Sequence, residues 1–418
     1  MARKILIVGA GQSGLQLSLG LLQHGYDVTV MSARTGEEIR NGRVMSTQGM
    51  FDTALQHERD LGLNYWEDDA PAFEGIAFTL AGPDGGRALE WTGRFDAYGQ
   101  SVDQRVKMSG WLEDFENRGG KVVIHGVTVS DLDRLTPRYD LTIVAAGRGE
   151  LVNLFRRNAS LSPYTAPQRA LAVVYVHGVL PRPENTDLNA VSFDLMPGVG
   201  ELFIIPAFTT GGPCTIIFFE GIPGGPLDCW SGIRAPEEQL KLTLELIKKF
   251  VPWEYERTCN AELTDWGGTL SGRFTPVVRH PVGRTPSDGT ALGIADVVVA
   301  NDPITAQGSN NASKCAATYL KAILDHGDQP FDEQFMQAAF DSFWESAQYS
   351  TIWTNAMLQP PPPHVVELLG AAGQYPEVAN RLTNGFNNPR DFFEWFMDPD
   401  QAAAYLAEVR ARTAAYRS

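Results

Sequence analysis

A glycine-rich turn near the start of the chain restricts the fold more than any other feature. Residues 4–8 read KILIV, a β-branched and aliphatic run typical of a strand buried on both faces of a parallel sheet. Residues 9–14 follow as GAGQSG, a GxGxxG pattern, and residues 15–24 carry leucines at helical spacing. A second strand is predicted over residues 27–31. This order predicts a dinucleotide-binding βαβ unit.

Each glycine of this turn has its own physical role. Gly9 permits the tight turn, Gly11 lets the backbone approach a pyrophosphate, and Gly14 allows the helix to lie close to the strand. The start of the helix adds N–H groups without helical partners and about half a positive charge, both of which attract phosphate. Gln12 and Ser13 belong to the same turn and are therefore included in the predicted cofactor site.

The end of the second strand departs from the usual pattern. An acidic residue normally binds a ribose hydroxyl there, whereas this chain has Ser32 followed by Arg34. Ser32 can hydrogen-bond a ribose more weakly, and Arg34 can face an adenine ring or a phosphate. Because an arginine near this place can also bind the 2′-phosphate of NADP, these two residues leave both FAD and NADP open.

A second helix-opening turn, in the last third of the chain, favours the longer cofactor. Residues 302–311 form a polar turn before an amphipathic helix predicted over residues 312–324. Such a turn is unusual for a simple dehydrogenase, but the flavin end of FAD needs its own backbone N–H donors. A helix start at Gln307 and Gly308 can supply these donors, and Asp296 can accept a hydrogen bond from a ribityl hydroxyl. Together with the first turn, this pattern favours FAD over a plain capped loop.

Between the two cofactor segments the pattern changes to strand-like runs broken by glycine and proline turns, with a helix predicted over residues 237–250. The predicted strands are residues 171–175, 191–195, 202–205 and 215–219. We therefore predict an α/β fold: a Rossmann-like FAD-binding domain, an inserted and mostly antiparallel β-sheet substrate domain, and a C-terminal helical region. The predicted ranges are 1–165 and 281–330 for the FAD-binding domain, 166–280 for the substrate domain and 331–418 for the helical region.

Charge and cysteine usage exclude several functional classes. The 34 basic and 50 acidic residues give a formal net charge of −16 without a Lys/Arg cluster, which argues against nucleic acid and anionic membranes as partners. The four cysteines form no CxxC pair and the seven histidines form no HxxH or HxxxH pattern, so we expect neither a metal site nor a disulfide framework. Since the chain opens directly into a strand and its longest apolar runs are strand-sized, we expect a cytoplasmic protein.

The chain resembles the oxygenase component of two-component styrene and indole monooxygenases (flavoprotein monooxygenase group E), within the hydroxylase-type, GR2-like flavoproteins. The resemblance covers nearly the whole chain. It is carried by residues 5–14, 42–47, 102–105, 146–147, 302–308 and 384–389 and by Trp395. Members of this family lack the usual acidic residue at the end of the second strand, which accounts for Ser32.

The resemblance implies a reaction. A separate NADH-dependent flavin reductase supplies reduced FAD, which reaches the oxygenase by diffusion. The bound reduced FAD and O₂ give a C4a-(hydro)peroxyflavin, which transfers one oxygen atom to an alkene-like double bond or a sulfide. Because the protein mainly binds the flavin, aligns the substrate and excludes water, no side chain is expected to act as an acid or base, and no metal is expected. The sequence also leaves a homodimer open.

The resemblance also implies a cofactor site, in which Arg43 and Val44 lie against the flavin. The predicted cofactor-binding residues are Gly9, Gly11, Gln12, Ser13, Gly14, Ser32, Arg34, Arg43, Val44, Arg105, Ala146, Gly147, Asp296, Pro303, Gln307, Gly308, Ser309 and Asn310.

Positions 46, 48 and 50 point to the substrate branch. Styrene-type members resemble an Asn, Val, His pattern at these positions, whereas this chain has Ser46, Gln48 and Met50, which is similar to the indole type. Gln48 can accept a hydrogen bond from an indole N–H, and the polarizable sulfur of Met50 can contact a flat ring. The alternative is that the three residues only pack a loop. On a looser match, Phe73 and Ile76 add apolar wall.

Other readings of the same features remain. One is a single-component aromatic hydroxylase that binds NAD(P)H itself. A flavin-dependent halogenase would be expected to carry a WxWxIP segment, which this chain lacks. A reading from another class is a flavin- or NADP-binding protein without oxygenase activity, which is favoured if Arg34 binds a 2′-phosphate.

Overall fold

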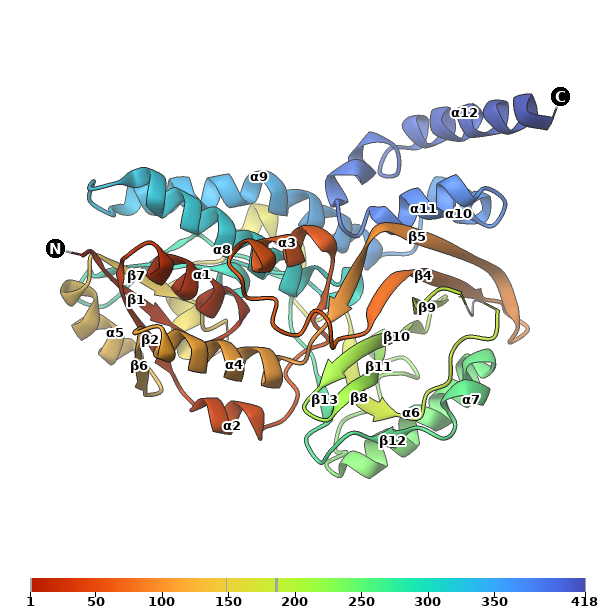
Figure 1. The fold of residues 1–418 in the computed structure, drawn as a ribbon. Coiled ribbons are helices and arrows are strands. Elements are labelled where there is room, and N and C mark those ends of the chain that lie inside the picture. The colour runs from red at the N-terminus through yellow and green to blue at the C-terminus, as the bar shows by residue number, and fades with distance from the viewer. Residues whose placement is uncertain (1, 148, 185–186, 418) are drawn as a thin grey trace. The chain divides into compact units, whose positions relative to one another are not determined.

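The computed structural model describes residues 2–147, 149–184 and 187–417, and the chain divides into two compact units (Figure 1). Unit 1 comprises Met1–Asp68, Val102–Ala166 and Thr275–Gln348. Unit 2 comprises Asp69–Ser101, Pro167–Phe274 and Tyr349–Ser418. Each unit is therefore assembled from three segments that are distant in the sequence.

A mostly parallel sheet forms the centre of unit 1, with the strand order β15-β16-β7-β1-β2-β6. These strands are β1 (Lys4–Val8), β2 (Asp27–Ser32), β6 (Lys121–Ile124), β7 (Leu141–Val144), β15 (Val282–Arg284) and β16 (Thr290–Gly293). Strand β1 pairs in parallel with β2 and β7, while β15 pairs antiparallel with β16. Four consecutive residues of β1 are buried, as expected for a central strand covered on both faces.

Helices cover this sheet and supply most of the core of unit 1. They are α1 (Gln12–Gln23), α2 (Gly36–Arg40), α3 (Asp52–Asp60), α4 (Gln104–Asn117), α5 (Val129–Leu135), α8 (Gln307–His326) and the first part of α9 (Glu333–Met357). Short elements are β3 (Gly49–Met50), β14 (Val277–Val278), β17 (Val299–Ala300), η1 (Thr136–Arg138), η2 (Glu150–Leu154), η3 (Ala159–Leu161), η4 (Ala295–Val297) and η5 (Pro303–Thr305). Helices α1 and α8 approach closely at Gly20, where a glycine is needed because a Cβ would lie 2.6 Å from the Leu320 side chain.

A largely antiparallel sheet forms unit 2, with the order β12-β8-β11-β10-β9-β4-β5 and with β13 also paired to β8. Its strands are β4 (Ala72–Ala81), β5 (Arg87–Ser101), β8 (Ala170–His177), β9 (Ala190–Met196), β10 (Gly200–Thr209), β11 (Gly212–Gly221), β12 (Glu262–Leu263) and β13 (Thr269–Gly272). All four strands predicted after residue 170 are present and extend beyond their predicted bounds. Strand β4 runs parallel to β9, with Phe78 in register with Phe193.

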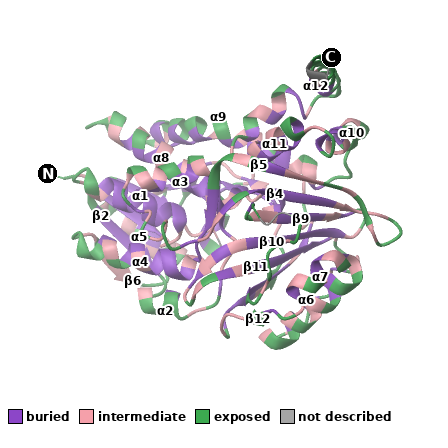
Figure 2. Ribbon diagram, turned by 45° about the vertical axis from the view of Figure 1, so that its right-hand side comes forward, coloured by how far each residue is buried: buried purple, intermediate pink, exposed green. Residues whose placement is uncertain are grey.

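The helices of unit 2 pack on this sheet and on one another. They are α6 (Pro236–Phe250), α7 (Pro252–Thr258), α10 (Pro363–Ala372), α11 (Pro376–Asn384), α12 (Pro399–Arg417) and the short η6 (Pro389–Glu394). Leu246 and Ile247 of α6 join the core that contains Val174 of β8 and Ile217 of β11. Figure 2 shows the resulting contrast, with buried strands β10 and β11 and exposed outer faces on α6 and α7.

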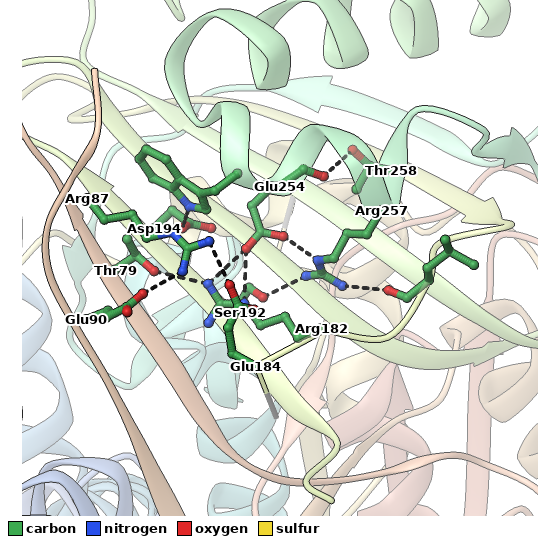
Figure 3. Close-up of polar contacts among 12 residues, drawn as sticks. Thr79, Arg87, Glu90, Arg182, Glu184, Ser192, Asp194, Glu254, Arg257 and Thr258 are labelled. Carbon is green, nitrogen blue, oxygen red and sulfur yellow. Dashed lines mark hydrogen bonds and ion pairs between the residues drawn. The ribbon is translucent and has the colours of Figure 1, made fainter. Parts of the chain in front are cut away.

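A group of charged side chains is buried in unit 2 where α7 packs on the sheet (Figure 3). The Glu254 carboxylate, only 1% exposed, pairs with the guanidinium groups of Arg182 and Arg257. The fully buried Asp194 of β9 accepts a 2.7 Å hydrogen bond from the Trp253 indole N–H at Oδ1, but none of the described residues donates to its Oδ2. Burial, and then the nearby Glu254 carboxylate, raise the pKa of Asp194 to about 7.

Candidate active site

The three glycines of the turn between β1 and α1 have different surroundings. Gly9 and Gly14 are required by the fold, whereas Gly11 faces open space. A Cβ on Gly14 would lie 2.2 Å from the Gly9 carbonyl oxygen, and Gly9 itself has a φ of +121°. A Cβ on Gly11, in contrast, would meet no atom of the described residues within 4 Å. Gly11 is the N-cap of α1, and no side chain caps this helix start. Open space in front of backbone N–H donors suits a pyrophosphate.

Local hydrogen bonds constrain the two unusual residues at the end of β2. The Ser32 hydroxyl donates to the Arg34 carbonyl oxygen at 2.5 Å and accepts from the Arg34 N–H at 3.2 Å. Because a hydroxyl has a single hydrogen to donate, Ser32 can only accept a further hydrogen bond from a ribose. The exposed Arg34 side chain reaches the sulfur of Met45, with Nη2 and Sδ 3.2 Å apart.

The start of α8 repeats the features of the start of α1. Its N-cap, Ala306, has left-handed backbone angles (φ 54°, ψ 27°), and the helix start has neither a side-chain cap nor an acidic residue in its first turn. A Cβ on Gly308 would meet nothing within 4 Å. Gln307 is fully buried and donates from Nε2 to the Thr305 carbonyl oxygen, while Ser309 is half-buried. This second open, positively polarised helix end fits the predicted flavin end of the cofactor.

The chain segments after β7 and before β17 meet in unit 1. A Cβ on Gly147 would lie 2.9 Å from Cβ of Asp296, so the two backbones are in close contact here. Ala146 is half-buried and Asp296 is exposed. Pro303 begins η5, whose N-cap Asp302 accepts a 3.2 Å hydrogen bond from the Ile304 N–H. The exposed Asp296 therefore lies beside Gly147.

Arg105 is buried and contacts the segment that contains the predicted flavin-binding residues Arg43 and Val44. Its side chain is 2% exposed and pairs with Asp103 at 2.8 Å. Nη1 also donates to the Gly42 carbonyl oxygen at 3.3 Å. The residues that follow are an exposed Arg43 and a buried Val44. The structure therefore shows Arg105 anchoring the segment that presents Arg43 and Val44.

The predicted substrate residues Ser46 and Gln48 contact each other. The Ser46 hydroxyl donates to Gln48 Oε1 at 2.7 Å, which orients the amide. Gln48 has a φ of +28°, a value that is uncommon outside glycine and that clusters at functional sites. Phe73 and Ile76 are buried on β4 and belong to unit 2.

The side chain of Asn310, which was predicted to bind the cofactor, hydrogen-bonds the backbone of residues 49–51, next to the predicted substrate residues. Its Oδ1 accepts from the Phe51 N–H at 2.9 Å, and its Nδ2 donates to the Gly49 carbonyl oxygen at 2.9 Å. Nδ2 also donates to the Ala306 carbonyl oxygen at 2.7 Å. Since Gly49 and Phe51 flank Met50, the first turn of α8 fixes the backbone around this residue. Sequence reasoning missed this role, because the partners are about 260 positions apart.

Two further buried residues near this segment, Lys107 and Glu58, were missed. Lys107 of α4 pairs with Glu58 of α3, and Gln12 donates from Nε2 to Glu58 Oε1 at 2.9 Å. Because the Gln12 side chain is hydrogen-bonded inside the protein, the group of Gln12 that can bind a ligand is its backbone N–H. Ser13 is also buried. Isolated Lys and Glu residues on helices normally face solvent, so no sequence signal marked this pair.

Within the described ranges, no group of three or more His, Cys, Asp or Glu residues is arranged to hold a metal ion. None of the described helices combines the length and the hydropathy needed to cross a membrane.

Solved structures with similar folds include flavin-dependent enzymes. The flavin-dependent brominase Bmp2 superposes with a TM-score of 0.64 at 14% identity, covering 94% of this chain and 97% of its own. A flavoprotein/dehydrogenase from Cytophaga hutchinsonii gives a TM-score of 0.66 at 14% identity, with coverage of 92% and 94%. At this level of identity the comparison concerns the fold, and it confirms the predicted α/β class.

Sequence relatives are more specific. Residues 147–257 match the family described as "Styrene monooxygenase A putative substrate binding domain". Two proteins named Styrene monooxygenase StyA, from Pseudomonas sp and Pseudomonas fluorescens, are each 30% identical over 424 residues, covering 99% of this chain and 100% of the relative. The chain therefore belongs to the styrene monooxygenase family, the oxygenases of two-component flavin-dependent monooxygenase systems.

Proposed function

We propose that the protein uses externally supplied reduced FAD and O₂ to oxygenate indole at the double bond of its five-membered ring, and accepts styrene-like alkenes and sulfides as further substrates. The observation that carries the choice of indole is the Gln48 amide, whose oxygen is held by Ser46 at 2.7 Å. A carbonyl oxygen has two lone pairs, so Gln48 Oε1 can accept a second hydrogen bond from the indole N–H. Styrene has no such donor.

Reduced FAD, when bound, supplies the electrons that activate O₂ for transfer of one oxygen atom. The residues of this chain bind and orient. The open space at Gly11 and the start of α1 suit the pyrophosphate, and the start of α8 suits the flavin end. Arg43 and Val44, on the segment anchored by Arg105, are proposed to contact the flavin. The partner proposed for the protein is an NADH-dependent flavin reductase, as in the family.

The direct test supplies photoreduced FAD to the purified protein without oxygen, then mixes it with aerated buffer containing indole. We expect oxygenated indole in proportion to the reduced FAD supplied. NADPH without a reductase should give no product. Turnover with NADPH alone would instead identify a single-component hydroxylase, and flavin reoxidation without oxygenated indole or styrene would exclude an oxygenase.

Gln48→Leu is expected to lower kcat/KM for indole about fivefold while leaving kcat/KM for styrene unchanged, since a net hydrogen bond is worth about 1 kcal/mol. Leu and Gln are both unbranched at Cβ, so the left-handed backbone at position 48 meets similar strain in both proteins. Ser46→Ala serves as the matched control, because it keeps the Gln48 amide but removes the hydrogen bond that orients it. We expect a smaller decrease of kcat/KM for indole and no change for styrene. Equal losses for both substrates would mean that Gln48 only packs the loop.

A further inference from the structure

A buried ammonium–carboxylate pair contacts one of the proposed substrate residues in unit 1. Lys107 Nζ lies 2.8 Å from Glu58 Oε1 and 3.0 Å from Oε2. The two side chains are only 4% and 3% exposed. A buried pair of this kind contributes little net stability, because desolvation of both charges offsets their attraction. Its geometry is therefore the feature to explain.

The third donor of the ammonium group is directed at Met50. Lys107 Nζ lies 3.3 Å from the Met50 sulfur, and Met50 is 1% exposed. A lysine has three N–H donors, and Glu58 and Met50 account for all three. Methionine has three rotatable side-chain bonds and adapts readily to its surroundings. A hydrogen bond to its sulfur restricts this freedom, so that Met50 presents a defined shape.

The Lys107–Glu58 pair is also linked by hydrogen bonds to α1 and α8, the two helices whose starts are proposed to bind FAD. Glu58 Oε1 accepts from Gln12 Nε2 in the first turn of α1. Gln12 Nε2 also donates to Gln16 Oε1 at 3.1 Å, and Gln16 Nε2 donates to the Ser313 carbonyl oxygen of α8 at 3.1 Å. Asn310, in the first turn of α8, holds the backbone on both sides of Met50. Met50 is thus fixed by its backbone from α8 and by its sulfur from α4.

We propose that Lys107, held in place by Glu58, is a positioning residue that fixes the Met50 side chain for contact with a flat aromatic substrate. The inference rests on the proposed function for the placement of Met50 at the substrate. On this inference, the substrate selectivity that depends on Met50 requires three side chains, Met50, Lys107 and Glu58. Lys107 and Glu58 do not touch the substrate themselves.

The enzymatic test is a mutant cycle. The double variant Lys107→Leu, Glu58→Gln removes both charges without adding a methionine, and so avoids leaving one buried charge unpaired. Met50→Leu removes the sulfur at nearly constant volume. Each is expected to raise KM for indole about fivefold with kcat changed less than about twofold, and their combination should raise KM no further, because both remove the same hydrogen bond. Multiplying effects, or an equal loss of FAD affinity, would overturn the inference.

A second readout does not depend on turnover. Methionine labelled with ¹³C at the methyl group gives one NMR signal for each of the nine methionines, and the Met50 signal is identified by its absence in Met50→Leu. We expect this signal at a position characteristic of one rotamer in the native protein, and at the averaged position in the double variant. An unmoved Met50 signal would overturn the inference.

Two outcomes remain to be separated. If the double variant does not fold, Lys107→Arg, which keeps the buried ion pair with Glu58 but changes the donor that faces the sulfur, is expected to move the Met50 signal; no movement counts against the inference. If the native protein does not oxygenate indole, the proposed substrate is wrong, while the NMR result still decides whether Lys107 positions Met50.

Discussion

Gly11→Ala is expected to fold as the native protein does and to bind FAD on the order of 100-fold more weakly. The added methyl group meets no atom within 4 Å in the part of the chain that the structure describes, and the backbone angles of Gly11 (φ −94°, ψ −174°) are allowed for alanine. The only atoms it can displace are those of a ligand in front of the start of α1. Two charge-assisted hydrogen bonds lost at about 1.5 kcal/mol each correspond to this factor.

The measurement is FAD affinity by fluorescence titration, together with the thermal unfolding midpoint of the protein without FAD. Gly14→Ala is the matched control: its methyl group would lie 2.2 Å from the Gly9 carbonyl oxygen, so the unfolding midpoint itself should fall. Wild-type FAD affinity in Gly11→Ala would show that the pyrophosphate does not bind at this turn.

Asp194→Asn is expected to stabilise the protein at pH 8 and to leave its stability nearly unchanged at pH 4. Burial and the Glu254 carboxylate raise the folded-state pKa of Asp194 from 3.8 to about 7. Between these two values the folded state binds more protons than the unfolded state, so stability falls as the pH rises through this window and the loss is complete above pH 7. The shift corresponds to an upper value of about 4 kcal/mol.

The geometry supports the amide as a replacement. Asparagine keeps an oxygen for the Trp253 indole N–H, and its neutral amide removes the buried charge that Arg182 and Arg257 offset only in part, because both pair with Glu254 (Figure 3). Unfolding midpoints of the two proteins should diverge as the pH is raised from 4 to 8. Parallel pH profiles would show that Asp194 is not the titrating group. Glu254→Gln, which removes the carboxylate that both arginines pair with, should be less stable than the native protein at pH 8.

The βαβ unit could be predicted closely from the sequence because its signals are local. The strand expected over residues 4–8 is β1, and the one expected over residues 27–31 is β2 with one further residue. The amphipathic pattern of α8 indicated a start at residue 312, whereas the helix begins at Gln307. Its first turn contains buried polar residues, which hide the helical periodicity.

Long-range pairings could not be predicted. The hairpin of β4 and β5 was missed, and its parallel pairing with β9 joins residues more than 100 positions apart. At the candidate site, the sequence indicated which segments matter but not how their side chains are used. Arg105 and Asn310 were predicted to bind the cofactor, and the structure shows both holding backbone groups of residues 42–51.

The division of unit 1 among three chain segments bears on how the protein is made. Strand β7 lies between β1 and β16, and β16 lies about 150 positions later in the chain. Helix α8, which packs against α1, ends at His326. A ribosome therefore has to synthesise more than three quarters of the polypeptide before the nucleotide-binding sheet and its helices can close. An N-terminal fragment ending near residue 165 therefore leaves β7 with an open edge and α1 without its partner helix.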